Sequence, residues 1–322
     1  MVASCQCRRN RNLRGLSANR TGLTRARSKQ LISILQLGTI DYATGLRLQQ
    51  QLVALRKEGK IGDLLLLLEH NPVITLGRNA KTAHVIASPE LLAQRGVELF
   101  ECDRGGDVTF HGPGQIVGYP IFDLRGFARG AADAPSALRK SLGAVDFVRR
   151  LEEVLIRTCA DFAIPTKRIP GLTGVWTDNN SLSFRAEEND SQNRSLESRN
   201  LLFAGSTANA AEAKIAAIGI HISRFVTSHG FALNVSTDLS YFNLIIPCGI
   251  TAKPVTSMQQ ELGKALDLNA VTESISRNFG TVFSTQMLWV DTLDALLGRT
   301  VGVPVQLPAE FRHLHKEDTF WS

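Results

Sequence analysis

The chain has 322 residues, which is enough for one large domain or two small ones. Its 43% hydrophobic and 20% charged residues are ordinary for a globular enzyme, and no apolar run reaches the roughly 18 residues needed to span a membrane. The formal charge of +6 comes from a tail, because residues 1–40 carry +8 and the rest of the chain about −2. A basic folded surface of the kind that binds nucleic acid is therefore not expected.

The tail and the cysteines bear on the cellular compartment. Residues 1–30 are rich in Arg, lack acidic residues and have no apolar stretch, so they indicate either a bacterial extension or a mitochondrial transit peptide. The five cysteines are sparse and odd in number, which favours a reducing compartment over a disulfide framework. Cys5 and Cys7 have no second Cys/His pair at metal-ligand spacing, so no metal site is predicted. We expect a disordered extension at 1–30 and a cytoplasmic protein, with a mitochondrial location as the alternative.

Taken in chain order, the first half predicts strands that alternate irregularly with helices. Asp41 is a typical helix cap, and Gly59 is a typical stop after the helix that follows it. Strands are predicted at 31–37, 64–68, 73–76 and 97–102, and helices at 41–57 and 89–95.

The clearest helix spans about 144–162, where apolar residues recur at steps of three and four. This stripe runs from Val145 and Val148 through Leu155 to Cys159, which we interpret as a buried small hydrophobe. The polar stretch at about 178–212 predicts a surface insertion. Beyond it we predict strands at 215–222 and 231–235 and helices near 258–266 and 271–279.

The order of these elements lacks strict strand–helix–strand alternation. We therefore predict an α+β fold, and residues 31–322 are expected to form a single domain with the insertion at about 178–212.

A glycine-rich segment at 104–119 is the strongest local signal. It begins Arg104-Gly-Gly-Asp-Val-Thr-Phe-His-Gly-Pro-Gly-Gln115, and we interpret it as a loop whose backbone approaches a ligand closely. The spacing of Gly112, Gly114 and Gly118 is one residue too long for a dinucleotide-binding fingerprint, and no Walker loop occurs. His111 is interpreted as part of a pocket wall, where it would orient a carbonyl or contact a carrier group.

One thiol and one amine stand out as candidates for chemistry. Cys248 lies between Pro247 and Gly249, which break regular structure and favour an accessible thiol. Lys214 begins an apolar strand, so its amine is expected to be partly desolvated. A nearby ammonium lowers the pKa of a thiol, and the thiolate is the nucleophile. A thioester donor would be activated already and would make ATP unnecessary.

These segments resemble a known family. Together they are similar to the lipoyl(octanoyl) transferases, over about residues 31–266, in the motifs Glu69-His-Asn-Pro-Val-Ile-Thr-Leu-Gly-Arg78, Arg104–Gln115, Pro170-Gly-Leu-Thr-Gly-Val-Trp176, Lys214-Ile-Ala-Ala-Ile-Gly219, His229-Gly-Phe-Ala-Leu-Asn234 and Pro247-Cys-Gly249. The resemblance implies the fold of the biotin and lipoate protein ligase catalytic domain, a mixed β-sheet with flanking helices.

The resemblance also implies an activity, which is octanoyl transfer from octanoyl-acyl carrier protein to a lysine of a lipoyl domain. Cys248 would carry the acyl group as a thioester, and Lys214 would lower the pKa of the thiol or act as its base. Substrate contacts are expected from Arg104, Gly105, Gly106, Asp107, Val108, Thr109, Phe110, His111, Ala217, Ile218, Gly219, Gly230, Phe231 and Ala232.

Partners and cofactors follow from the same resemblance. The expected partners are acyl carrier protein, the lipoyl domains of 2-oxoacid dehydrogenase complexes and the glycine cleavage H protein. Neither ATP nor a metal ion is expected as a cofactor, and the protein is expected to be a monomer.

Two alternatives stay open at this point. One is an ATP-dependent lipoate or biotin protein ligase, which would share the lysine without needing the thiol. The other is a non-catalytic module that binds acyl groups or lipoyl domains and keeps only the scaffold. The presence of both Cys248 and Lys214 favours the transferase.

Overall fold

The structure is a computed structural model that describes residues 30–127, 141–178, 212–247 and 253–293. The predicted N-terminal extension, except its last residue, lies outside these ranges. So do most of the predicted insertion and Cys248 itself.

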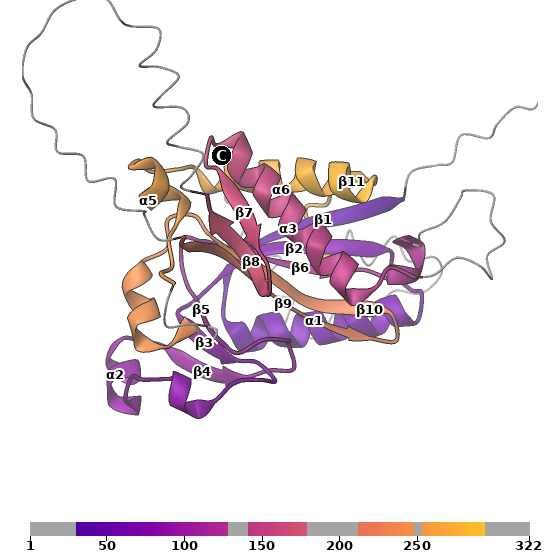
Figure 1. The fold of residues 1–322 in the computed structure, drawn as a ribbon. Helices are drawn as coiled ribbons and strands as arrows, with labels where there is room; N and C mark the ends of the chain where they lie inside the picture. The colour runs from indigo at the N-terminus through magenta and orange to yellow at the C-terminus, as the bar shows by residue number, and fades with distance from the viewer. Residues whose placement is uncertain (1–29, 128–140, 179–211, 248–252, 294–322) are drawn as a thin grey trace, which may run out of the picture.

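The described strands form one large mixed sheet and one small one (Figure 1). The large sheet has eight strands in the order β11–β1–β2–β6–β10–β9–β8–β7, within the described residues. β1 runs parallel to β2 and β11, and the remaining neighbours are antiparallel. Its strands are β1 (Leu31–Ile40), β2 (Asp63–His70), β6 (Gln115–Ile121), β7 (Thr166–Ile169), β8 (Leu172–Thr177), β9 (Lys214–Ser223), β10 (Val226–Asn234) and β11 (Gln286–Trp289).

The small sheet places β3 (Val73–Leu76) between β4 (Glu98–Glu101) and β5 (Val108–His111). β3 is parallel to β4 and antiparallel to β5. Side chains of this sheet and of the 3₁₀ turn η4 (Leu239–Leu244) share a separate apolar cluster that includes Ile74, Phe110 and Phe242.

Helices cover both faces of the large sheet. Helices α3 (Ala144–Asp161) and α6 (Leu268–Phe283) bury Leu151 and Phe279 in one cluster against the sheet, and α1 (Tyr42–Lys57) buries Leu48 in another. Asp41 caps α1 by accepting a hydrogen bond from the amide of Thr44 at 2.8 Å. The shorter helices are α2 (Pro89–Gln94) and α5 (Met258–Leu262), and the other 3₁₀ turns are η1 (Thr82–His84) and η2 (Leu124–Phe127).

The predicted α+β fold, a mixed sheet with flanking helices, is confirmed. Cys159 is fully buried on α3, as the apolar stripe predicted, and burial raises the pKa of its thiol to about 12. None of the helices in the described ranges has the length and apolar character needed to cross a membrane.

Three local predictions were wrong. Residues 104–119 are not a continuous loop, because β5 and most of β6 lie within them and pair with other strands. Val145 is 73% exposed because it lies in the first turn of α3, on the side facing away from the sheet. The helix predicted at 258–266 ends at Leu262, since Gly263 adopts the left-handed conformation that terminates helices.

Candidate active site

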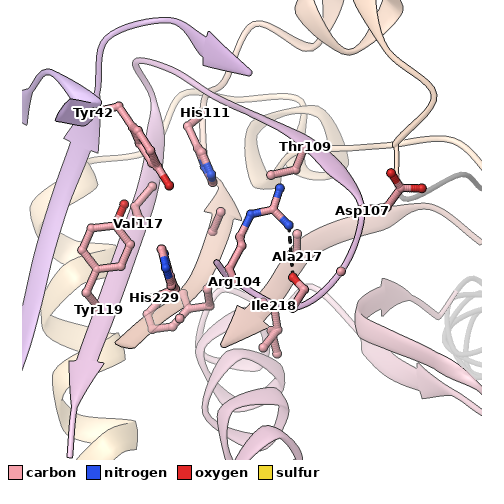
Figure 2. A pocket seen from close by; sticks show the side chains of 16 residues that line it. Tyr42, Arg104, Asp107, Thr109, His111, Val117, Tyr119, Ala217, Ile218 and His229 are labelled. Atoms are coloured by element: carbon pink, nitrogen blue, oxygen red, sulfur yellow. Dashed lines mark hydrogen bonds between the residues drawn. The ribbon is translucent and has the colours of Figure 1, made fainter. Parts of the chain in front are cut away.

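A cavity lies between the small sheet and the α1 face of the large sheet, with about 490 Å³ of empty space including its open mouth. Figure 2 shows Arg104 near its centre, with Tyr42, Tyr119 and His229 on one side and Thr109 and Ala217 on the other. Its lining comprises Tyr42, Arg104, Gly105, Gly106, Asp107, Thr109, His111, Val117, Tyr119, Ala217, Ile218, Gly219, His229, Gly230, Phe231 and Ala232.

Most residues that the sequence suggested as substrate contacts meet in this cavity. The exceptions are Val108 and Phe110, which pack into the apolar cluster of the small sheet. They alternate along β5 with Thr109 and His111, which line the cavity. A strand directs successive side chains to opposite faces, so treating the segment as a loop could not separate the two sets.

A second, smaller cavity contains Lys214. It has about 280 Å³ of empty space including its opening, and it shares Thr109, Ala217 and Ala232 with the first cavity. Lys214 and Pro247 both belong to its lining. The two cavities are therefore adjacent, with Thr109, Ala217 and Ala232 at their junction and Lys214 in the wall of the smaller one.

The surroundings of Lys214 hold its side chain in a narrow space. The residue is 8% exposed, and its ammonium lies 4.8 Å from the ring centroid of the buried Trp176, a cation–π distance. A Cβ added at Gly174 would lie 2.6 Å from the carbonyl oxygen of Ala216, so glycine there lets β8 approach β9 beside Lys214. The predicted desolvation of this amine agrees with its burial.

Backbone hydrogen bonds fix Lys214 to the segment that follows residues 248–252. Its amide donates to the carbonyl of Pro254 at 2.8 Å, and its carbonyl accepts from the amide of Thr256 at 3.0 Å. Since Pro247 lies in the same cavity, both described flanks of the Cys248 segment meet at Lys214.

A chain of side-chain hydrogen bonds joins the two cavities. Asn234 donates to the carbonyl of Thr256 at 3.0 Å, which leaves its Oδ1 to accept from Nε2 of Gln115 at 2.8 Å. Oε1 of Gln115 then accepts from Nδ1 of His111 at 2.7 Å. His111 must therefore carry its proton on Nδ1, so Nε2 is an acceptor, 3.5 Å from the hydroxyl of Thr75.

Arg104 is buried in the cavity wall, where uncharged oxygen atoms accept hydrogen bonds from its guanidinium. Its guanidinium donates to the carbonyl of Thr75 at 2.7 Å, to the Thr75 hydroxyl at 2.8 Å and to the carbonyl of Gly105 at 3.1 Å. A Cβ at Gly219 would lie only 2.7 Å from the Gly105 carbonyl oxygen. Glycine at 219 therefore lets the loop that carries Arg104 approach β9.

Two buried histidines flank the cavity in the neutral state. Burial lowers the pKa of His70 to about 4 and, mainly through the same cause, that of His111 to about 3. His70 donates from Nδ1 to the carbonyl of Ile40 at 2.9 Å, so its Nε2 accepts from the Tyr119 hydroxyl at 2.6 Å. Both rings are held as hydrogen-bonded, uncharged groups at neutral pH.

These shifts predict a loss of stability in mild acid. An unfolded histidine protonates below about pH 6.5, whereas His70 stays neutral in the folded protein down to about pH 4. The unfolded state binds more protons in this window, so the free energy of unfolding falls as the pH falls, by up to about 1.4 kcal/mol per pH unit for each histidine. Urea unfolding between pH 7 and 4.5 measures this slope. A slope unchanged by His70→Gln would contradict the assignment to His70.

Sequence reasoning missed four residues of the larger cavity: Tyr42, Val117, Tyr119 and His229. Tyr42 comes from α1, far in sequence from the glycine-rich segment. His229 belongs to a motif that the sequence had singled out, but nothing in the order of residues shows its unusual backbone. It has a left-handed φ of 55° within β10.

The two sheets and their helices thus enclose two adjacent cavities, one of which is lined by the buried Lys214. The family model described as the lipoyl protein ligase A/B catalytic domain matches residues 41–280. The octanoyltransferase of Koribacter versatilis is 54% identical over 89% of this chain and 98% of its own length, and that of Acidobacterium capsulatum is 52% identical over 83% and 96%.

The chain therefore belongs to the lipoyl protein ligase A/B family and, within it, to the octanoyltransferases, which are acyltransferases. The predicted resemblance and the prediction of an acyltransferase are confirmed.

Solved structures show the same fold at much lower identity. A bi-partite lipoate protein ligase from Thermoplasma acidophilum has a TM-score of 0.54 at 13% identity, covering 84% of this chain and 89% of that one. A lipoate-protein ligase A bound with ATP has a TM-score of 0.53 at 12% identity, covering 83% and 91%. These likenesses concern the fold alone.

Proposed function

We propose that the protein transfers an octanoyl group from octanoyl-acyl carrier protein to a lysine of a lipoyl domain, through a thioester on Cys248. One observation carries the proposal: Lys214 and Pro247, the residue bonded to Cys248, line the same cavity, which adjoins a slot walled by Val117, Ala217 and Ala232. An acyl chain in the slot would have its carbonyl at the lysine. Each methylene buried there contributes about 0.8 kcal/mol.

In the first half-reaction, the thiolate of Cys248 attacks the carbonyl carbon of the donor thioester. A new C–S bond forms, the C–S bond to the carrier breaks, and the carrier thiolate leaves. The proton that Cys248 gave up passes through Lys214 to that leaving thiolate. The ammonium of Lys214 stabilises the negative sulfur before attack, which is why a buried amine at this place is useful.

In the second half-reaction, the amine of the acceptor lysine attacks the acyl-enzyme. A C–N bond forms, the C–S bond to Cys248 breaks, and the proton lost by the amine returns to the sulfur. Because the donor is an activated thioester and the product amide is more stable, the reaction needs neither ATP nor a metal ion. We propose acyl carrier protein and lipoyl domains, including the glycine cleavage H protein, as the macromolecular partners of a cytoplasmic monomer.

The experiment is intact-protein mass spectrometry of the full chain mixed with octanoyl-acyl carrier protein in the absence of ATP. We expect a mass increase of one octanoyl group that hydroxylamine removes, as it does for a thioester. The gain should disappear when a lipoyl domain is added and reappear on that domain. Acceptor labelling only from free octanoate with ATP would contradict the transferase and favour a ligase.

Binding of either protein without any transfer would instead favour the non-catalytic module. In that case the enzyme would keep its original mass, without an added octanoyl group, after incubation with the donor. The same experiment therefore separates the three functions that the sequence left open.

A further inference from the structure

Among the residues of β10 that line the larger cavity, His229 lies farthest along the strand from the Lys214 end. In the pairing of β9 with β10, Ala217 faces Ala232, then Gly219 faces Gly230, and His229 faces Ile220. Lys214 and Asn234 lie at the opposite end, in the adjoining cavity. At about 3.4 Å per residue, His229 lies about 17 Å along β10 from Asn234. An acyl chain whose carbonyl is at Lys214 therefore directs its methyl end toward His229.

The side chain of His229 lies on the face opposite to the one that strand alternation predicts. Phe231 and Leu233, which share its parity along β10, pack in the cluster beneath α3 and α6. His229 instead meets the ring of Tyr119, which belongs to the α1-side cluster, at 6.5 Å and a near-perpendicular angle of 88°. Figure 2 shows it beside Tyr119 in the cavity.

The reversed direction depends on an unfavourable backbone. The φ of 55° at His229 is left-handed, a conformation that costs a residue with a side chain roughly 1–2 kcal/mol. Such a conformation persists only when surrounding groups hold it. Here Oε1 of the buried Gln49 accepts from the amide of His229 at 2.8 Å.

A carboxylate fixes the ring itself. Nε2 of His229 lies 2.7 Å from Oδ1 of Asp103, which precedes the glycine-rich segment. Asp103 also contacts His221 on the neighbouring strand at 3.1 Å. The ring of Tyr119 is held in turn, because its hydroxyl donates to Nε2 of His70. Residues from α1, from β2 and from the segment before β5 thus hold the rings of His229 and Tyr119 at one end of the cavity.

We propose that His229, positioned by Asp103, and Tyr119 form the end wall of the acyl slot and set the longest chain that the enzyme accepts. This inference rests on the proposed function, since it takes the acyl carbonyl to be at Lys214. It makes His229 a specificity-determining residue that limits chains longer than octanoyl, and Asp103 a positioning residue that acts through His229.

The test is His229→Gly. Glycine adopts a φ of 55° without strain, so the variant removes the imidazole ring while the backbone keeps the conformation seen in the structure. We expect the ratio of kcat/KM for dodecanoyl- over octanoyl-acyl carrier protein to rise about tenfold or more, because each additional buried methylene contributes about fourfold. The profile is measured with donors of eight, ten, twelve and fourteen carbons.

Arg224→Gly is the matched control. Arg224 has a φ of 50° and lies exposed in the turn between β9 and β10, so the substitution makes the same backbone change outside the cavity. Its chain-length profile should match that of the unchanged protein. Should His229→Gly fail to fold, His229→Asn is the second variant, because asparagine tolerates the left-handed conformation and is smaller than histidine. It should give a smaller shift in the same direction.

Asp103→Asn tests the positioning role, and it is expected to broaden the chain-length profile in the same direction as His229→Asn. If His229→Gly and His229→Asn both transfer octanoyl groups with the original profile, the end wall is refuted and the transferase stands. If the unchanged protein accepts no acyl-carrier donor of any length, the proposed function fails instead.

Discussion

Cys248→Ala is expected to lower the rate of octanoyl transfer by about 10⁴-fold or more, because the covalent step loses its proposed nucleophile. Cys248 lies outside the described residues, but it is bonded to Pro247, which lines the cavity of Lys214. The acyl-enzyme peak in intact-protein mass spectra should disappear in the same variant.

Cys159→Ala is the control for loss of a thiol. Cys159 is fully buried on α3, and burial keeps its thiol protonated at neutral pH. Removing its sulfur costs stability through a small cavity, about 1–2 kcal/mol, but should leave transfer at 25 °C unchanged. Acylation of Cys248→Ala, or transfer at an undiminished rate, would rule out Cys248 as the nucleophile.

Lys214→Met is expected to lower transfer by about 10²- to 10⁴-fold, the usual contribution of a positioned acid–base group. Methionine keeps an unbranched stem over the ring of Trp176, so the packing against that ring is retained. The missing ammonium should raise the pKa of the Cys248 thiol. Alkylation of Cys248 by iodoacetamide should therefore become slower at pH 7 and shift its pH dependence upward.

Lys253→Met provides a closely matched control. The ammonium of Lys253 lies 5.8 Å from the same Trp176 ring but is ion-paired with Glu212, and its side chain is 26% exposed. A partly exposed pair of this kind contributes about 1 kcal/mol or less. Transfer by Lys253→Met should stay within a few-fold of the unchanged protein. Equal losses in the two variants would assign the effect to general charge rather than to Lys214.

Buried polar groups organise this site as much as its apolar walls do. The chain from the Thr256 carbonyl through Asn234 and Gln115 fixes the tautomer of His111, and it begins on the segment bonded to the backbone of Lys214. Each member is satisfied by the next, so these uncharged groups hold one another in place. A wall held in this way suits the proposed binding of a flexible acyl chain in one position.

Local patterns in the sequence were sufficient for much of the fold and for the family. The apolar stripe of α3 predicted the burial of Leu155 and Cys159, because a helix brings residues three and four apart onto one face. The short motifs around Lys214 and Cys248 carried the family, since they combine an amine, a thiol and glycines in a fixed order. The family match confirmed that interpretation.

Only the tertiary structure decided which residues meet around the slot. The glycines at 104–119 suggested a loop, whereas pairing with β3, β2 and β10 makes strands of β5 and β6. Tyr42 reaches the site from α1, and Asp103 lies 126 positions away in sequence from the His229 that it contacts. The direction of the His229 side chain depends on a left-handed φ that Gln49 and Asp103 hold in place. Contacts between distant segments determine such features, and no local pattern of residues records them.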